Sequence, residues 1–84
     1  MHFINIGFGN MVRGEGITCM IGPDSAPAKR YIHDARESSM LIDATCGRRT
    51  KGVIFMEDGR VILTALLPET IAGRLKSQYS GDES

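Results

Sequence analysis

The residues best suited to chemistry lie in one short polar segment, residues 45–52, named here the basic segment. Arg48, Arg49 and Lys51 place three cations within four positions, and a glycine stands on each side of them. Arginine forks, backbone N–H groups and threonine hydroxyls are the usual protein partners of phosphate oxygens. The segment therefore indicates a contact with phosphate or nucleic acid. A charged loop that is merely solvated is the alternative that composition leaves open.

A second group of cations has helical spacing. Lys29 and Arg36 stand seven positions apart with His33 between them, and Arg30 is adjacent. The spacing places them beside or opposite an apolar stripe of the same helix. Because carboxylates lie among these cations, a solvated face is the simpler interpretation. Lys29, Arg30 and Arg36 are therefore second-rank candidates for the same contact.

Candidates for catalysis are weak, and an enzyme is not expected. His33 precedes Asp34, but adjacent helical residues point to different sides and cannot form a general base with its orienting partner. The glycines near residue 8 lack the third glycine of a dinucleotide fingerprint, since Val12 stands there. Neighbouring arginines could activate Cys46, although a small residue in a turn is the favoured interpretation. Neither a metal site nor a cofactor is predicted.

Composition limits the classes of protein that this chain can be. It has 84 residues, of which 42% are hydrophobic, so one packed domain is expected rather than disorder. Ten Lys+Arg balance ten Asp+Glu, but residues 29–51 hold six cations against three carboxylates. The two cysteines are too few for a disulfide framework and are expected to be reduced and buried. With no long apolar run and no signal-peptide pattern, a small cytoplasmic domain is predicted.

Apolar patterning predicts the elements that must position these residues. Strands are expected at 3–6, resuming at 11–12, and at 17–21, followed by a helix with Pro27 in its first turn that ends near residue 38. A short strand at 41–44 precedes the basic segment. A hairpin of strands 53–56 and 61–66 turns at Asp58-Gly59, and Pro68 opens a second helix. The fold class is α+β, a small single domain with a mainly antiparallel sheet and two helices, over residues 1–79 with a polar tail at 80–84.

The hairpin carries a further expectation about assembly. Residues 53–56 are all apolar, and residues 61–66 are apolar except Thr64. A continuous apolar run indicates a strand that is covered on both faces. Either the two helices sandwich the sheet, or a partner subunit covers part of one face. The second interpretation is favoured.

Several sequence blocks together resemble the RemA family of bacterial extracellular-matrix regulatory proteins. The blocks are residues 3–12, 23–27, 34–36, 43–50 without Cys46, and 68–70. The resemblance implies a DNA-binding transcriptional regulator of biofilm-matrix genes. It also implies a domain similar to LytTR-type DNA-binding domains, assembled into a ring with DNA along its basic outer rim. The family's arginine pair for DNA binding falls on Arg48 and Arg49, and its functionally sensitive proline falls on Pro27.

Two departures from the family leave target preference open. Some relatives carry an arginine where this chain has Gly16. Either Arg13 supplies that charge from three residues upstream, or the contact is missing. Cys46 stands where relatives have histidine. The predicted DNA-binding residues are Arg48, Arg49, Lys51, Arg13, Lys29, Arg30 and Arg36.

The resulting hypothesis is a ring-forming homo-oligomer, cytoplasmic and associated with the nucleoid, that binds double-stranded DNA. It involves no membrane and no cofactor. The alternative is an oligomeric interaction scaffold whose basic segment binds an acidic protein or a small phosphorylated ligand.

Overall fold

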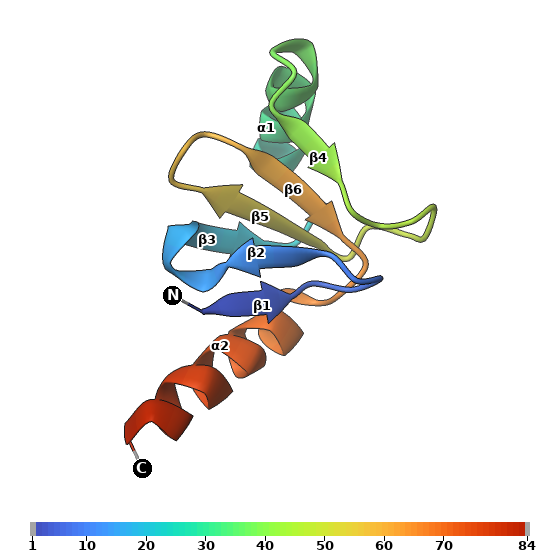
Figure 1. The fold of residues 1–84 in the computed structure, drawn as a ribbon. Helices are drawn as coiled ribbons and strands as arrows, with labels where there is room; N and C mark the ends of the chain where they lie inside the picture. Colours follow the sequence, from blue (N-terminus) through green and yellow to red (C-terminus); the bar gives the residue numbers. More distant parts are fainter. Residues whose placement is uncertain (1, 84) are drawn as a thin grey trace.

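The chain folds around a four-stranded sheet with an α-helix on one face and a second helix with a small β-hairpin on the other (Figure 1). The computed structural model describes residues 2–83, with side chains up to residue 77. The elements are β1 (Phe3–Asn5), β2 (Met11–Arg13), a 3-10 turn (Gly14–Gly16), β3 (Ile17–Ile21), α1 (Ala26–Glu37), β4 (Leu41–Asp43), β5 (Gly52–Met56), β6 (Val61–Thr64) and α2 (Pro68–Glu83).

The central sheet has the strand order β3-β5-β6-β4. Its β3–β5 and β5–β6 pairs are antiparallel, whereas β4 runs parallel to β6. The predicted hairpin of β5 and β6 is present, and Gly59 at its turn has φ +93°, which glycine adopts without strain. The α+β class and the mainly antiparallel sheet are therefore confirmed.

Both faces of the β5–β6 hairpin are covered by the chain itself. On one face Val53, Val61 and Leu63 pack with Ala35 of α1. On the other face a second cluster packs together, formed by Ile4, Ile6, Val12, Ala44, Ile54, Ile62 and Ile71. The buried residues of this face are covered within the chain, because β1, β2 and α2 together supply the missing layer. Phe55 and Met56 are only half-buried, and cover of this part of the hairpin by a partner subunit stays a prediction.

The N-terminal segment forms two strands rather than one interrupted strand. β1 and β2 pair antiparallel as a separate two-stranded sheet, with Ile4 opposite Val12. Three successive residues at the turn have positive φ, +106° at Gly7, +55° at Phe8 and +78° at Gly9. This run reverses the chain direction, so the glycines serve a hairpin turn.

Helix α1 begins as the sequence predicts. Ser25 is its N-cap and accepts a hydrogen bond from the Ala28 N–H at 3.2 Å, with Pro27 in the first turn. The apolar stripe is only partly buried. Ala28 and Ala35 are inside, but Tyr31 is 55% exposed and its ring packs edge-on against Phe55.

Replacing Pro27 with Ser should lower the free energy of unfolding by about 1 kcal/mol, because proline restricts the unfolded chain. DNA binding should fall by more than this loss explains if the first turn of α1 positions the nearby cations. Ser25→Ala is the matched control, since loss of the N-cap also costs about 1 kcal/mol. Urea unfolding and DNA titration of both variants measure the two effects. If Pro27→Ser binds DNA with the same affinity as wild type, Pro27 has no role in DNA binding.

Helix α2 is anchored near its middle. Its Arg74 donates a hydrogen bond through Nη1 to the Asn5 carbonyl at 2.6 Å, and Ile71 is fully buried. The backbone of α2 continues to Glu83, so part of the predicted tail at 80–84 is helical, and residue 84 lies outside the described residues. The division into a domain and a tail stays a prediction. Within the described residues, no helix is long and apolar enough to cross a membrane.

Candidate nucleic-acid interface

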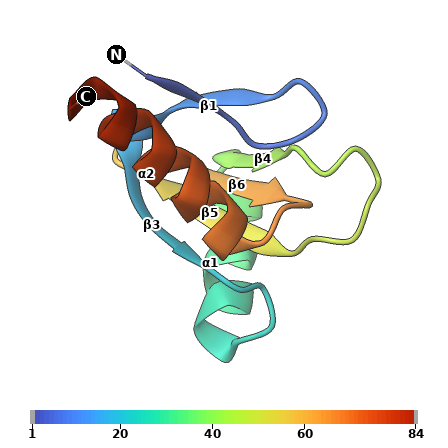
Figure 2. The same ribbon diagram turned by 90° about the horizontal axis from the view of Figure 1, so that it is seen from below.

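Four loops meet at one end of the molecule, named here the loop end. They are the β1–β2 turn (residues 6–10), the β3–α1 connection (22–25), the β4–β5 loop (44–51) and the β6–α2 connection (65–67). Figures 1 and 2 show all four on the same side, opposite the turn that joins β5 to β6. The arrangement follows from topology, since β1, β3, β4 and β6 all end there and β5 starts there. The cations of the basic segment lie in the third of these loops.

The β4–β5 loop is tied at both ends to strand β6. The Ala44 N–H donates to the Leu63 carbonyl, and the Lys51 N–H donates to the Thr64 carbonyl, both at 2.9 Å. Between these ties the Arg48 N–H donates to the Thr45 carbonyl at 3.0 Å, closing a turn. Both central residues of that turn, Cys46 and Gly47, have positive φ, the pattern of a type I′ turn. The loop therefore has a defined backbone while its cationic side chains remain exposed.

Gly52 closes the basic segment for a steric reason. A Cβ built at this position would lie 2.7 Å from the Leu66 carbonyl oxygen and 3.0 Å from the Thr64 side chain. Only glycine fits where the chain passes this close to the β6–α2 connection. The second glycine of the segment is thus required for close packing of two loops at the loop end.

Asp43 fixes the start of the basic segment. Its Oδ1 accepts hydrogen bonds from the Thr45 hydroxyl at 2.6 Å and from the Thr45 N–H at 3.0 Å. These two bonds lower the pKa of the Asp43 carboxyl below its ordinary value, and the charge of Arg36 lowers it further. Because Thr45 is buried, the pair orients the chain just before the arginines.

Acid should weaken the fold partly through Asp43. Its folded pKa is lower than the unfolded value of about 3.9, so the carboxylate stabilises the fold above that value. This stabilisation disappears as the pH falls through the folded pKa. Asp43→Asn keeps an acceptor for Thr45 but loses the charge. The stability difference between wild type and Asp43→Asn, measured by urea unfolding, should therefore shrink from pH 6 to pH 3, and a difference that is independent of pH would contradict this account.

The β1–β2 turn is held beside the basic segment by asparagine side chains. The Asn5 side-chain oxygen accepts from the Gly7 N–H at 2.7 Å, and the Asn10 amide donates to the Gly7 carbonyl at 3.0 Å. The same Asn10 amide reaches the Ala44 carbonyl at 3.4 Å, which links the turn to the β4–β5 loop. Thr64 adds a buried bond to the Ile6 carbonyl at 2.7 Å. The two loops are thus positioned as one surface.

Two clefts border the cations of the basic segment. The first has a volume of about 340 Å³ and is lined by Phe8, Arg48, Arg49, Lys51, Ala65 and Leu66. The second has a volume of about 240 Å³ and is lined by Pro23, Asp24, Arg49, Thr50, Lys51 and Leu67. Arg49 and Lys51 lie between the two. In the part of the chain that the structure describes, no carboxylate lies within 4.0 Å of Arg48, Arg49 or Lys51, although Asp24 lines the second cleft. Three exposed cations are therefore available to an anion.

The other predicted cations lie elsewhere or at the border of this surface. Arg13 lies at the far end of the molecule, where its Nη2 is 2.6 Å from a carboxylate oxygen of Glu57. The structure of one chain therefore does not bring Arg13 to the loop end. Lys29 and Arg30 are exposed in the N-terminal half of α1, which starts at the loop end, and Arg36 lies in its last turn. A DNA contact by any of these four stays a prediction.

The cysteines differ from expectation in their burial. Cys19 and Cys46 are both free, as predicted, but both are exposed rather than buried. Cys46 occupies the tight turn that closes before Arg48, and Cys19 lies in the edge strand β3. In the described residues, no cluster of three or more His, Cys, Asp or Glu side chains could hold a metal ion.

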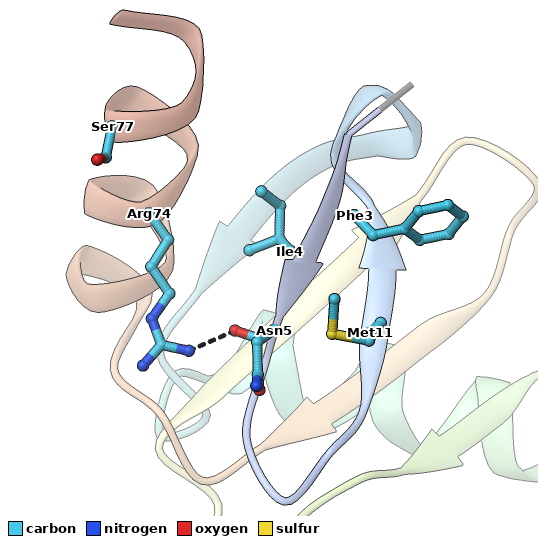
Figure 3. A pocket seen from close by; sticks show the side chains of 6 residues that line it. All are labelled: Phe3, Ile4, Asn5, Met11, Arg74 and Ser77. Atoms are coloured by element: carbon cyan, nitrogen blue, oxygen red, sulfur yellow. Dashed lines mark hydrogen bonds between the residues drawn. The ribbon is translucent and has the colours of Figure 1, made fainter. Parts of the chain in front are cut away.

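A larger cleft lies on the outer side of β1, away from the basic segment (Figure 3). Its volume is about 470 Å³, and it is lined by Phe3, Ile4, Asn5, Met11, Arg74 and Ser77. The cation in this cleft, Arg74, is already bonded to the Asn5 carbonyl, as the dashed line shows. Its guanidinium therefore serves to fasten α2 to β1, and the basic segment remains the stronger candidate site.

Sequence reasoning missed the residues that surround the cations. Phe8 lies between the two expected strand segments and is not among the predicted site residues, yet the Arg48 guanidinium carbon lies 5.8 Å from the centroid of its ring. Leu66 and Leu67 are expected at a strand end and in a connection, but they line the two clefts. A bulky residue between two glycines is the one available signal, since such a turn exposes its central side chain.

Comparisons with known proteins, by family model and by individual relatives, match nearly the whole chain and agree with each other. The family model described as "RemA-like: Extracellular matrix regulatory protein A-like" matches residues 3–75. A protein from Geobacillus kaustophilus is 55% identical over 83 residues, which cover 99% of this chain and 92% of the relative. One from Carboxydothermus hydrogenoformans is 52% identical over 82 residues, with 98% and 94% coverage. One from Dictyoglomus turgidum is 50% identical over 84 residues, with 100% and 99% coverage. Each bears a name that begins "Putative regulatory protein".

Proposed function

The chain belongs to the RemA-like family, and from this membership we propose that it is an oligomeric regulator that binds double-stranded DNA through its loop end. The family and the names of the relatives indicate a regulatory protein rather than an enzyme. The proposed targets are extracellular-matrix and biofilm genes, which places the protein in the cytoplasm at the nucleoid. The likeness to LytTR-type domains and the ring are parts of the same proposal.

The observation that carries the proposal is the set of three exposed cations on an ordered loop. Arg48, Arg49 and Lys51 have no carboxylate within 4.0 Å among the described residues, whereas Arg13 and Arg60 each have one. Arginine forks on a fixed backbone suit phosphate oxygens, which accept two parallel hydrogen bonds. Phosphate contacts position a protein on DNA without reading its sequence. The loop end is thus suited to bind the phosphate backbone of a DNA duplex.

Oligomerisation explains how subunits that each make few phosphate contacts bind DNA with useful affinity. One subunit has a formal net charge of zero and offers only a few phosphate contacts. A ring would present the same loop end many times along one duplex, and linked contacts multiply modest affinities. Among the residues whose side chains the structure describes, up to residue 77, neither helix has an exposed face rich in Asn, Gln and Arg, so little direct base readout is expected. Selectivity would then come largely from the shape and bending of the duplex.

The rival proposal is an oligomeric scaffold whose loop end binds an acidic protein or a phosphorylated small ligand. The open clefts beside Arg49 are large enough to admit a phosphorylated group. Titration with duplex DNA of unrelated sequence, in parallel with a panel of phosphorylated metabolites and an acidic peptide, separates the two. Salt-dependent binding to DNA without saturable binding to the metabolites or the peptide is expected. Tight binding to one of these ligands and none to DNA would favour the scaffold.

The mass of the assembly in solution tests the oligomer. Sedimentation at micromolar concentration should give several times the 9.2 kDa of one chain, in low and in moderate salt. Apolar side chains that are exposed on one chain, which include Met11, Tyr31 and Ile42, are available to a subunit interface. A clean monomer in both salts would remove the ring and the avidity that the proposal requires.

A further inference from the structure

The side chain of Phe8 has a position that its role in a turn does not explain. Its φ is +55°, a conformation that is uncommon for any residue other than glycine and an outlier for a bulky one. Phe8 is 52% exposed, so the strain is not offset by burial in the core. Strained backbone that persists is held by its surroundings and concentrates at functional sites.

Hydrogen bonds of the residues on both sides of Phe8 hold its backbone in this conformation. The Ile6 N–H donates to the Asn10 carbonyl at 2.9 Å, and the Asn10 N–H donates to the Gly7 carbonyl at 3.0 Å. The side chains of Asn5 and Asn10 add two bonds to Gly7. These bonds determine the turn fully, so Phe8 at its tip cannot relax without breaking them.

The fixed ring faces the basic segment. The Cζ atom of Arg48 lies 5.8 Å from the ring centroid, within the range of a cation–π contact. Phe8 and Arg48 also line the same cleft, together with Lys51 and Leu66. The contact crosses between two loops that are themselves linked by the bond from Asn10 to the Ala44 carbonyl.

We infer that Phe8 is a positioning residue of the DNA site, whose ring face holds the Arg48 guanidinium in the orientation that receives a DNA phosphate. The inference rests on the proposed function. A free arginine loses rotamer freedom when it binds, and a side chain that is ordered beforehand loses less. The contact with Phe8 orders the Arg48 side chain before DNA binds, so Arg48 loses less rotamer freedom on binding. The strained turn places the ring of Phe8 at that contact.

Two substitutions separate the ring face from the turn. Phe8→Leu keeps an apolar side chain and the same backbone strain but has no π face, whereas Phe8→Tyr keeps the face. An exposed cation–π contact corresponds to about a threefold change in affinity per engaged subunit. DNA affinity of Phe8→Leu should therefore fall at least threefold, and that of Phe8→Tyr should stay near wild type. The slope of log K against log salt should not change in either variant, because every cation remains.

A second readout does not depend on DNA. In protein labelled with ¹⁵N-arginine, the ring current of Phe8 shifts the Arg48 Nε–Hε resonance, and Phe8→Leu should remove that shift while Phe8→Tyr retains it. At low salt, Phe8→Leu should add no further loss of affinity in an Arg48→Ala background, since the partner of the ring is gone. A merely structural role of Phe8 would lower affinity equally with and without Arg48.

The outcomes are distinguishable. An Arg48 resonance that does not respond to Phe8→Leu would overturn the contact itself. A resonance that responds, with unchanged DNA affinity in Phe8→Leu, would overturn the positioning role and leave the proposed function intact. If wild type binds no DNA, the proposed function fails together with any role of Phe8 in it, while the resonance still reports the contact.

Discussion

The double variant Arg48→Ala/Arg49→Ala should lose nearly all DNA binding at physiological salt. Each arginine that binds a phosphate releases about one counterion, so removing one such arginine lowers the slope of log K against log salt by about 0.9. Several subunits bind one duplex in the proposed ring, and the effect therefore repeats at every engaged subunit. Binding titrations of wild type, both single variants and the double variant at several salt concentrations measure the slope.

The fold and the mass of the oligomer in solution should not change in this double variant. Both side chains are exposed on a loop whose backbone is fixed by other groups, among them Asp43 and Gly52. Lysine at either position should restore only part of the affinity, since it keeps the charge but lacks the planar fork. Arg60→Ala is the matched control, because Arg60 is an exposed arginine near Asp58 in the hairpin turn at the opposite end. Unchanged affinity and slope in the double variant would eliminate the basic segment as the DNA site.

Replacing Ile54 with alanine should lower the free energy of unfolding by about 2–5 kcal/mol. Ile54 is fully buried in strand β5, where it packs in the cluster formed with β1, β2 and α2. The loss should be a large share of the stability of so small a domain, for which about 5–15 kcal/mol is the usual range. Urea unfolding followed by circular dichroism measures it.

The same variant tests which chain covers the hairpin. Because the covering side chains belong to the same subunit, the difference between Ile54→Ala and wild type should not depend on protein concentration. Ile42→Ala is the control, since Ile42 lies in the edge strand β4 and is 39% exposed, so its loss should be much smaller. A difference that grows on dilution would mean that a partner subunit completes the core around Ile54.

Elements that depend on residues close together in the sequence, such as turns and helix starts, were predicted well. Asp58-Gly59 between two apolar runs predicted the hairpin, and the Asp58 side chain accepts a hydrogen bond from the Arg60 N–H in that turn. Pro27 predicted the start of α1 to within a residue or two. The basic segment was identified from its composition, and the structure shows its cations exposed on one ordered loop.

Features that depend on distant pairing could not be predicted. The apolar run of β5 showed that both faces are covered, but not by what, because Ile4 and Val12 contribute to that cover from a hairpin whose pattern resembles one interrupted strand. The contact between Phe8 and Arg48 spans 40 positions and depends on two loops meeting. Burial of the cysteines was inferred from residue type alone, and their place in a turn and an edge strand exposes them.

The two exposed cysteines provide the most direct test that DNA binds at the loop end. Cys46 lies in the basic segment, whereas Cys19 lies in strand β3 beside Tyr31 and Phe55. Alkylation of each thiol by a maleimide is followed by mass spectrometry with and without duplex DNA. Saturating DNA should strongly slow alkylation of Cys46 and leave the rate at Cys19 unchanged. Equal rates at Cys46 with and without bound DNA would show that the duplex lies elsewhere on the molecule.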